Sequence, residues 1–403
     1  MSDTHFDVVL YGATGFTGRQ AVAYFQQHAP AGLRWAVAGR SREKLEALAM
    51  AHGATGVIVA DSDQPATVEA MAARAGVLLT TAGPYSRYGT PVVEACVRHG
   101  VHYVDITGET PWVRGLIDAY DAEAARTGTR IVPFCGFDSV PSDLGVLAVV
   151  EHLRRTYDAD TRSVSASYTV RGGFNGGTAA SMMTLADTDP GGRLLNDVLL
   201  LNPADRQSEA ERARSADLRG VHYDALRKVW LAPFLMAAVN TRVVRRSNAL
   251  FAGWDRPYGA SFAYHEAHET KSRLKAYGIA AALGAVERAL DRGPVRWLAG
   301  KLSPAPGEGP SEATMDGGFM RGRYLGEAES GQRVLATMKA KGDPGNRVTV
   351  KILCESALLL AGGVDALPGG AARGGVLTPA TAFGLPLLER LRAQGFDWQI
   401  EAI

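Results

Sequence analysis

The stretch Gly12-Ala13-Thr14-Gly15-Phe16-Thr17-Gly18 directly follows the apolar segment Val8-Val9-Leu10-Tyr11 and precedes a helix-like segment that begins at Arg19. Glycines at such a junction permit a tight turn, close approach of the backbone to a pyrophosphate, and close packing of a helix on a strand. The helix amino terminus adds free N–H groups and a partial positive charge. We therefore predict that this stretch binds the phosphates of a nucleotide. The alternative is a glycine turn that only permits packing.

Five further apolar runs alternate with helix-like segments as far as about residue 145. They span residues 35–38, 57–60, 77–81, 101–105 and 130–134. Nearly continuous apolar strands, each followed by a segment of helical periodicity, indicate a parallel sheet buried on both faces. The sequence predicts an α/β fold with a Rossmann-type, doubly wound parallel sheet.

The pattern changes beyond residue 143. Alternation of polar and apolar residues predicts an antiparallel strand at 163–170 and a hairpin formed by 318–325 and 333–340. An apolar helix is expected over 350–361 and a closing strand over 395–400. We predict a nucleotide-binding domain, an inserted α+β domain and a C-terminal segment, with the bounds 1–143, 144–345 and 346–403.

Composition narrows the class of protein. There are 43 Lys and Arg residues against 42 Asp and Glu residues, a formal net charge of +1, so no basic footprint indicates a nucleic-acid partner. Three widely spaced cysteines exclude a zinc ribbon or a disulfide scaffold. A polar amino terminus and the lack of an apolar run of about 18 residues lead us to expect a soluble, cytoplasmic protein.

The residues after the second predicted strand indicate which dinucleotide is bound. NAD sites usually place an acid there to hold the ribose diol, whereas this strand ends in Gly39-Arg40-Ser41-Arg42 with no acid before Glu43. A guanidinium offers a planar donor fork for a 2′-phosphate, and the Ser41 hydroxyl can add a hydrogen bond. We therefore predict NADP, bound through Arg40 and Ser41. The alternative is a solvated basic helix start.

Two further strand ends complete the predicted cofactor site. Asp61 ends the third strand where the adenine normally lies, and it either accepts the exocyclic amine or caps residues 62–64. Small residues end the fourth strand and leave room for the nicotinamide half of the cofactor. They are Thr81, Ala82, Gly83 and Pro84.

Several motifs together resemble a known family. They are Tyr11–Gly18, Ala82-Gly83-Pro84-Tyr85, Tyr103–Glu109, Cys135–Asp143, Arg171–Thr178 and Gly374–Ala380. They resemble the saccharopine dehydrogenase-like oxidoreductases and, within these, the trans-acting enoyl reductases that serve lipid-making polyketide synthases. The resemblance covers almost the whole chain. It implies an NADPH-dependent reductase acting on the C=C bond of an acyl or polyketide-like lipid. It also implies that the C-terminal helix and strand return to the nucleotide-binding domain and that the middle domain mediates homodimerisation.

A reductase of this kind needs a proton donor at the carboxyl ends of the strands. Tyr85 and Asp138 are our catalytic candidates, although Tyr85 alternatively packs on the nicotinamide for shape alone and Asp138 alternatively anchors substrate or orients a water. Glu109 and Ser139 are candidates for substrate binding, with capping of the helix near Thr110 as the alternative for Glu109. Ser142 and Asp143 are expected to cap the next helix, and Cys135 to be a small core residue.

The sequence differs from saccharopine-forming enzymes in the arginines expected near the substrate. Recognition of two carboxylates and an amine calls for clustered arginines, and only Arg87 and Arg171 lie where such residues are needed. An apolar substrate is therefore favoured, with Arg171 retained as a substrate-binding candidate. An amino-acid or imine oxidoreductase, and a nucleotide-binding lipid-surface protein without turnover, stay open as alternatives.

The most apolar run of the middle domain is Val229–Val239, which holds Phe234, and Arg242, Arg245 and Arg246 follow it. One interpretation is an apolar tunnel for a long acyl chain, lined by Phe234 and rimmed by arginines that meet a carrier phosphate or a lipid headgroup. The other is a core helix with solvated arginines. We expect a small-molecule or carrier-bound acyl substrate and leave open a peripheral lipid contact.

A group of His and Glu residues at 265–269 has the composition of a metal site but not its spacing. It lacks the i, i+4 histidine pair that places two imidazoles on one helical face. No metal is expected.

Overall fold

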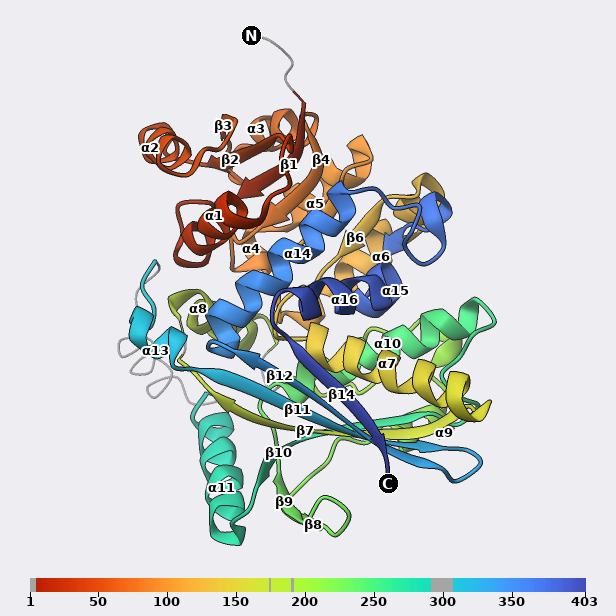
Figure 1. Ribbon diagram of the computed structural model, residues 1–403. Helices are drawn as coiled ribbons and strands as arrows, with labels where there is room; N and C mark the ends of the chain where they lie inside the picture. Colours follow the sequence, from red (N-terminus) through yellow and green to blue (C-terminus); the bar gives the residue numbers. More distant parts are fainter. Residues whose placement is uncertain (1–4, 174, 190–191, 291–306) are drawn as a thin grey trace.

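The computed structural model describes residues 5–173, 175–189, 192–290 and 307–403. It consists of two seven-stranded sheets, one lying above the other in Figure 1, with helices on both faces of the upper sheet and between the two sheets. The amino-terminal third of the chain supplies six strands of the upper sheet, and the carboxyl terminus ends against the lower sheet. The predicted α/β class is confirmed.

The upper sheet is entirely parallel, in the order β13-β6-β5-β4-β1-β2-β3. Strands β1 to β6 are those predicted from the apolar runs. The order reverses between β1 and β4, which places the crevice for a ligand at the carboxyl ends of these two strands. The strands are β1 (Phe6–Tyr11), β2 (Trp35–Gly39), β3 (Gly56–Val59), β4 (Ala75–Thr80), β5 (His102–Val104), β6 (Arg130–Val132) and β13 (Gly375–Val376).

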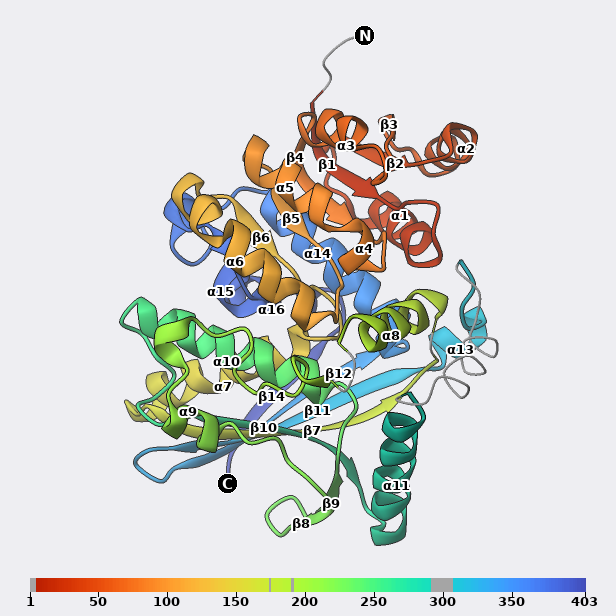
Figure 2. The same cartoon turned by 180° about the vertical axis from the view of Figure 1, so that it is seen from behind.

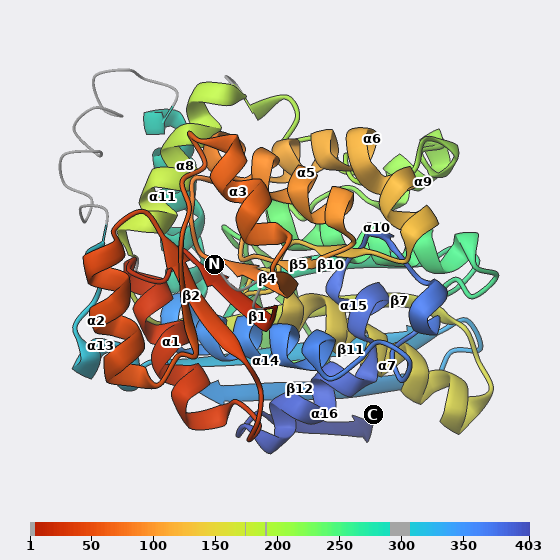
Figure 3. The ribbon, with the colours of Figure 1, turned by 90° about the horizontal axis from the view of Figure 1, so that it is seen from above.

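Alternate residues of each strand enter different cores. In β1, Val8 and Leu10 face the core shared with the lower sheet, whereas Val9 and Tyr11 face the opposite core. This explains why the strands are apolar throughout. Seen from above, α1 and α14 cover one face and α3, α5 and α6 the other (Figure 3). The helices of this part are α1 (Phe16–His28), α2 (Arg42–His52), α3 (Pro65–Ala72), α4 (Tyr85–Tyr88), α5 (Thr90–His99), α6 (Thr110–Thr127) and α14 (Thr349–Ala361).

The lower sheet is mixed, in the order β14-β12-β11-β7-β10-β9-β8. The predicted hairpin is confirmed as β11 and β12, and the predicted strand at 163–170 is β7, antiparallel to β11 but parallel to β10. The strands are β7 (Thr161–Arg171), β8 (His222–Asp224), β9 (Val229–Ala232), β10 (Ala263–Thr270), β11 (Phe319–Ala328), β12 (Arg333–Lys341) and β14 (Asp397–Ala402).

Helices α7 and α10 pack between the two sheets, and α11 projects from the lower sheet (Figures 1 and 2). The remaining helical segments are α7 (Val140–Tyr157), α8 (Gly176–Thr188), η2 (Ala204–Arg206), α9 (Glu209–Arg214), α10 (Ala237–Gly253), α11 (Arg273–Leu290), α13 (Glu312–Asp316), η3 (Pro344–Val348), η4 (Gly370–Ala372), α15 (Pro379–Phe383) and α16 (Leu385–Ala393). No helix within these described segments is long and apolar enough to cross a membrane.

The C-terminal segment divides between the two sheets, which corrects one expectation. Helix α14 packs on the upper sheet and β13 pairs with β6, as the resemblance implied for this region. The final strand does not return to the nucleotide-binding domain. Instead β14 pairs antiparallel with β12, because its alternating side chains, among them half-buried Trp398 and Ile400, cover one face of the lower sheet. The bounds of the three predicted parts stay a prediction.

The arginines of α10 also differ from both interpretations of the sequence. Arg242, Arg245 and Arg246 are 1%, 3% and 2% exposed, so they neither rim a tunnel nor face solvent. Each guanidinium instead binds backbone carbonyls of neighbouring loops: Arg242 that of Leu195, Arg245 that of Val198, and Arg246 those of Leu201 and Val376. A planar fork with five donors suits this task, since it satisfies several buried carbonyls at once.

Candidate active site

The glycine-rich turn 12–18 follows β1 and leads into α1. Gly12 has a φ of +81°, and a Cβ there would lie 2.9 Å from the backbone nitrogen of Ala82. A Cβ on Gly18 would lie 2.2 Å from the carbonyl oxygen of Gly12. Gly15 is the N-cap of α1 and has no side chain to occupy the N–H groups of the first turn. These N–H groups are therefore placed to bind phosphate oxygens, with the help of the helix dipole.

The predicted ribose-phosphate residues lie at the end of β2. Arg40 is exposed, and Ser41 is the N-cap of α2 with no side-chain capping hydrogen bond, so neither side chain is tied up by that helix. Asp61, after β3, accepts a hydrogen bond from the Asp63 backbone N–H at 3.1 Å. This is the local turn that we gave as the alternative, and the adenine contact stays a prediction.

The residues after β4 pack directly against the glycine turn. Thr81 donates from its hydroxyl to the Gly12 carbonyl at 3.2 Å. Ala82 and Gly83 leave the surface above β4 without bulky side chains, and Pro84 is the N-cap of α4. Because β1 and β4 are adjacent, the two halves of a dinucleotide have a continuous path along this edge. The residues present therefore fit an NADP-type cofactor.

Tyr85 is buried rather than open to the crevice. The phenol donates to the Thr80 carbonyl at 3.2 Å, and the ring stacks on Trp112 at 5.8 Å. Burial raises the pKa of Tyr85 well above its usual value, and the nearby Asp105 carboxylate acts in the same direction. A phenol in this state is a weak proton donor, so the geometry favours a packing role, against Trp112 rather than on the nicotinamide as the alternative had it. The catalytic role of Tyr85 stays a prediction.

Glu109 forms a clamp between three segments. It is 2% exposed, and its carboxylate accepts from the backbone N–H groups of Tyr85 and Ser86 and from the Ser181 hydroxyl, each at 2.9 Å. It therefore caps α4 rather than its own helix α6, whose N-cap position it occupies without a side-chain capping bond. The same carboxylate fixes α8 beside α4 (Figure 2). Its role in substrate binding stays a prediction.

Asp138 and Ser139 lie in the turn between β6 and α7. Asp138 is partly exposed, but its Oδ1 is buried and has no hydrogen-bond partner within the described residues, and neither has the Oγ of fully buried Ser139. Burial, and then the neighbouring Glu266, raise the pKa of the Asp138 carboxyl to about 8, against a hydrogen bond from Asn240. A pKa raised in this direction lets the Asp138 carboxyl keep its proton to a higher pH than an exposed aspartate does, as a general acid requires.

A buried hydrogen-bond network adjoins Asp138, and the sequence did not predict it. Its centre is Glu266 on β10, which is 3% exposed and accepts from Asn240 at 2.7 Å, Tyr264 at 2.7 Å and Ser142 at 2.9 Å. In the sequence, Glu266 stands out only as one member of the metal-like group at 265–269. No alternation of polar and apolar residues singles it out, since Tyr264 and His268 share its face of β10.

The prediction that Ser142 and Asp143 cap the next helix is wrong, since α7 already begins at Val140. The hydroxyl of Ser142 contacts Tyr168 and Glu266, and Asp143 accepts from the Ala380 backbone N–H at 2.7 Å. Both point away from their own helix terminus because α7 starts inside the core, where partners from other elements are nearer. Cys135 is buried and donates to the Val132 carbonyl, which confirms it as a core residue.

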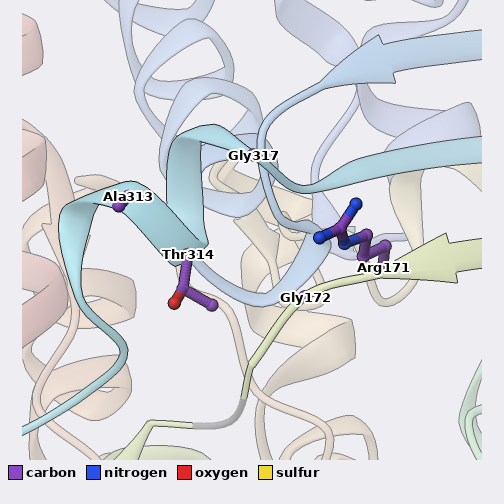
Figure 4. A pocket seen from close by; sticks show the side chains of 5 residues that line it. All are labelled: Arg171, Gly172, Ala313, Thr314 and Gly317. Atoms are coloured by element: carbon purple, nitrogen blue, oxygen red, sulfur yellow. The ribbon is translucent and has the colours of Figure 1, made fainter.

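The substrate candidates Phe234 and Arg171 lie at two different places. Phe234 is partly buried in the loop between β9 and α10, and its ring stacks on Tyr168 at 5.4 Å, next to the Glu266 network. Arg171 is exposed at the end of β7. It lines a hollow of about 280 Å³ with Gly172, Ala313, Thr314 and Gly317 (Figure 4). The structure therefore brings Phe234, but not Arg171, to the Glu266 network.

Comparison with known proteins places the chain. Residues 8–132 match the Saccharopine dehydrogenase NADP binding domain. The chain is 43% identical over 417 residues to a Mycobacterium tuberculosis protein named "Putative trans-acting enoyl reductase", with 98% of this chain and 97% of that one covered. The chain belongs to the saccharopine dehydrogenase-like oxidoreductases. A second relative, named "Trans-acting enoyl reductase" from Mycobacterium bovis, is 39% identical, with 98% and 97% covered.

A solved structure has a fold similar to that of this chain. Apo saccharopine dehydrogenase (L-Glu forming) from Saccharomyces cerevisiae matches with a TM-score of 0.54 at 14% identity, covering 98% of this chain and 99% of that one. At this identity the likeness shows the fold alone. The family assignment makes the chain an NADP-dependent oxidoreductase. Among the residues that the structure places, no group of three His, Cys, Asp or Glu side chains could hold a metal ion.

Arg40 provides a test of cofactor choice. We expect at least a 10-fold preference for NADPH over NADH in kcat/KM, about 1.4 kcal/mol, and expect Arg40→Ala to remove most of it because the 2′-phosphate loses its guanidinium. Arg42→Ala is the matched control, since Arg42 is exposed and pairs with Glu46 at 3.6 Å. Equal kcat/KM for the two cofactors in the unmodified protein would contradict the prediction.

Proposed function

We propose that this enzyme uses NADPH to reduce the C=C bond of an enoyl group in an acyl or polyketide-like lipid. The observation that carries the proposal is the buried, unpartnered Oδ1 of Asp138, in the turn after β6 at the same carboxyl edge of the sheet as the turns after β1 and β4. Burial raises the pKa of this carboxyl to about 8, the direction that a proton donor needs. The names of the two relatives, trans-acting enoyl reductases, support the same reaction. Reduction of an alkene conjugated to a thioester needs one hydride and one proton, and Asp138 can provide the proton.

When bound, NADPH supplies the hydride for the β-carbon of the enoyl group. Asp138 gives its proton to the α-carbon: the carboxyl O–H bond breaks, the electron pair of the enolate forms the new C–H bond, and a carboxylate remains until solvent reprotonates it. The clamp at Glu109 holds the loop after β4 in place through its bonds to Tyr85 and Ser86. A fixed loop keeps the reacting groups aligned.

The surroundings of this acid favour an apolar substrate. The ring of Phe234 lies beside the Glu266 network, and Val239 on the first turn of α10 lies 3.9 Å from where a Cβ on Gly108 would stand. The arginines that an amino-dicarboxylate would need are placed elsewhere: Arg171 lines the separate hollow, and Arg87 lies over the Tyr88 ring at 5.0 Å. These contacts support an acyl chain over a saccharopine-like substrate.

The test of the reaction is NADPH oxidation followed by stopped flow. A trans-2-enoyl thioester should give turnover, whereas saccharopine with NAD or NADP should give none. Turnover with saccharopine alone would replace the proposal by the amino-acid alternative. Tight NADPH binding without turnover on any alkene, imine or carbonyl would favour the non-catalytic alternative.

Phe234 tests the acyl chain directly. Phe234→Ala should lower kcat/KM for a sixteen-carbon enoyl thioester by about 10-fold and for a four-carbon one by less than about threefold, since each lost methylene contact is worth about 0.8 kcal/mol. Leu274→Ala is the control, because Leu274 is 84% exposed on α11. Equal losses at every chain length would make Phe234 a packing residue only.

The proposal also includes a carrier-bound substrate and a homodimer. The apolar side chains of Leu274, Tyr277 and Val286 are exposed on the projecting helix α11, which supports contact with another protein surface. Sedimentation of the purified protein measures the dimer, and the ratio of kcat/KM for carrier-bound and free thioesters measures the carrier preference.

A further inference from the structure

The hydroxyl groups beside Glu266 form a chain whose protons can be counted. Ser142 Oγ lies 2.9 Å from Glu266 Oε2 and 2.8 Å from the Tyr168 hydroxyl. The Tyr168 hydroxyl lies 3.0 Å from that of Tyr324, which lies 2.7 Å from the Pro141 carbonyl oxygen. All these side chains are completely or almost completely buried. The chain therefore contains four hydrogen-bonded contacts between oxygens.

Three hydroxyl protons are too few to place one proton in each of the four oxygen–oxygen contacts. Ser142, Tyr168 and Tyr324 each carry one donor proton, and a carbonyl oxygen carries none. If Glu266 is ionised, one contact of 3.0 Å or less joins two oxygens with no proton between them. The Tyr264 hydroxyl does not help, because its proton is directed at Glu266 itself at 2.7 Å. A fourth proton is required, and the carboxyl group at the end of the chain is where it can reside.

We infer that Glu266 is a neutral carboxylic acid in the folded protein and acts as a positioning residue for the proton on Asp138. The contact with Ser142 then runs in the direction opposite to that of an ionised carboxylate: the Glu266 O–H donates to Ser142. Ser142 donates to Tyr168, Tyr168 donates to Tyr324, and Tyr324 donates to the Pro141 carbonyl. Every contact then has one proton. The catalytic part of this inference rests on the proposed function, whereas the protonation of Glu266 does not.

The groups around Glu266 agree with a neutral acid. Asn240 and the Arg245 guanidinium approach from α10, Tyr264 from β10, Tyr168 from β7 and Asp138 from the turn before α7. Arg245 is the one cation that acts on Glu266 among these groups. It is already bound to Asp217 at 3.1 Å and to the Tyr264 carbonyl at 3.3 Å. Burial raises the pKa of Glu266 to about 7, in the direction that proton counting requires.

A neutral Glu266 has a consequence for Asp138. After Asp138 has donated its proton, its carboxylate faces an uncharged neighbour through the shared Asn240 amide. A charged Glu266 would repel that carboxylate and make Asp138 a weaker acid. The hydroxyl chain thus keeps Asp138 able to release its proton as long as the pH stays below the value at which Glu266 ionises, near 7. Buried Asn240, whose Oδ1 is without a partner among the described residues, lies between the two carboxyl groups.

The direct experiment is infrared spectroscopy of the full-length protein at pH 6. Glu266→Gln should lose the carbonyl band of one protonated carboxylic acid from the difference spectrum. Glu269→Gln is the matched control on the same strand, because Glu269 is equally buried but pairs with Arg321 at 2.7 Å. It should lose a carboxylate band instead. Loss of a carboxylate band in Glu266→Gln would overturn the inference and leave the proposed function intact.

A second measurement tests the link to Asp138 and allows for misfolding. The amide introduced by Glu266→Gln can donate to Ser142 as the acid does, so the variant should unfold at a similar temperature at pH 6 and lose less stability than the unmodified protein as the pH rises through 7. In the unmodified protein Glu266 ionises near pH 7, before Asp138, and its charge then helps to raise the pKa of Asp138 to about 8. The kcat–pH profile of Glu266→Gln should therefore keep the plateau and shift the basic limb to lower pH by about one unit, since this charge no longer appears. An unmoved basic limb would overturn the positioning role. If the infrared band of the protonated Glu266 acid is found but the unmodified protein does not reduce enoyl thioesters, only the proposed function is overturned.

Discussion

Replacement of Asp138 by asparagine should lower kcat roughly 10²–10⁴-fold, the usual contribution of a general acid, and leave NADPH binding unchanged. The amide has the size of the acid but no transferable proton. Its neighbour Asn240 stays in place because the introduced amide keeps one oxygen to accept the Asn240 hydrogen bond, and its nitrogen can replace Oδ1, which has no partner in the described structure. The measurement is single-turnover NADPH oxidation with a saturating enoyl thioester, alongside the Kd of NADPH by fluorescence.

The pH dependence has a definite sign. The proton donor is active while protonated, and burial raises the pKa of Asp138 to about 8, so kcat should be flat below that pH and fall above it. Asp143→Asn is the control: burial also raises the pKa of Asp143, to about 7, but this carboxyl binds the α15 backbone. That variant should change stability and not the basic limb. A rate that rises with pH would assign Asp138 the role of a base instead.

Gly18→Ala should weaken NADPH binding at least 100-fold, about 2.7 kcal/mol. The added Cβ would lie 2.2 Å from the Gly12 carbonyl oxygen and 2.9 Å from the Ala13 backbone, and backbone atoms cannot yield as a flexible side chain does. The first turn of α1 must therefore move away from β1, which carries its N–H groups out of reach of the phosphates.

The control for this variant is Gly115→Ala on α6. A Cβ on Gly115 meets no heavy atom within 4 Å, and alanine has the higher helix propensity, so the protein should bind NADPH normally. Titration of both variants with NADPH, with circular dichroism to verify folding, provides the comparison. Unchanged affinity in a folded Gly18→Ala protein would mean that the phosphates bind elsewhere.

The sequence predicts the parallel sheet because its signal is local. The apolar runs at β1, β2 and β4 are short and sharply bounded, and the glycine turn after β1 has a single structural interpretation. The hairpin of β11 and β12 is equally local, since its strands are adjacent in the chain and alternate in polarity.

The parts that the sequence did not predict depend on contacts between distant residues. Burial of the α10 arginines depends on carbonyl groups of residues 195, 198 and 201, which no periodicity brings to them. Glu109 binds Tyr85, 24 residues away, rather than its own helix. The Glu266 chain joins three strands and a helix, so its members are recognisable only once the lower sheet has formed. Long-range polar partners of this kind leave no local pattern.

The division of the chain end between the two sheets bears on how the protein is made. Strand β13 completes the upper sheet beside β6, about 245 residues later in the sequence, and α14 covers one of its faces. During synthesis, the amino-terminal third therefore leaves the ribosome with an uncovered apolar face and an unpaired edge. Such intermediates fold slowly and are prone to aggregation. Efficient production should therefore depend on chaperones that hold the nascent chain until α14 and β13 have emerged.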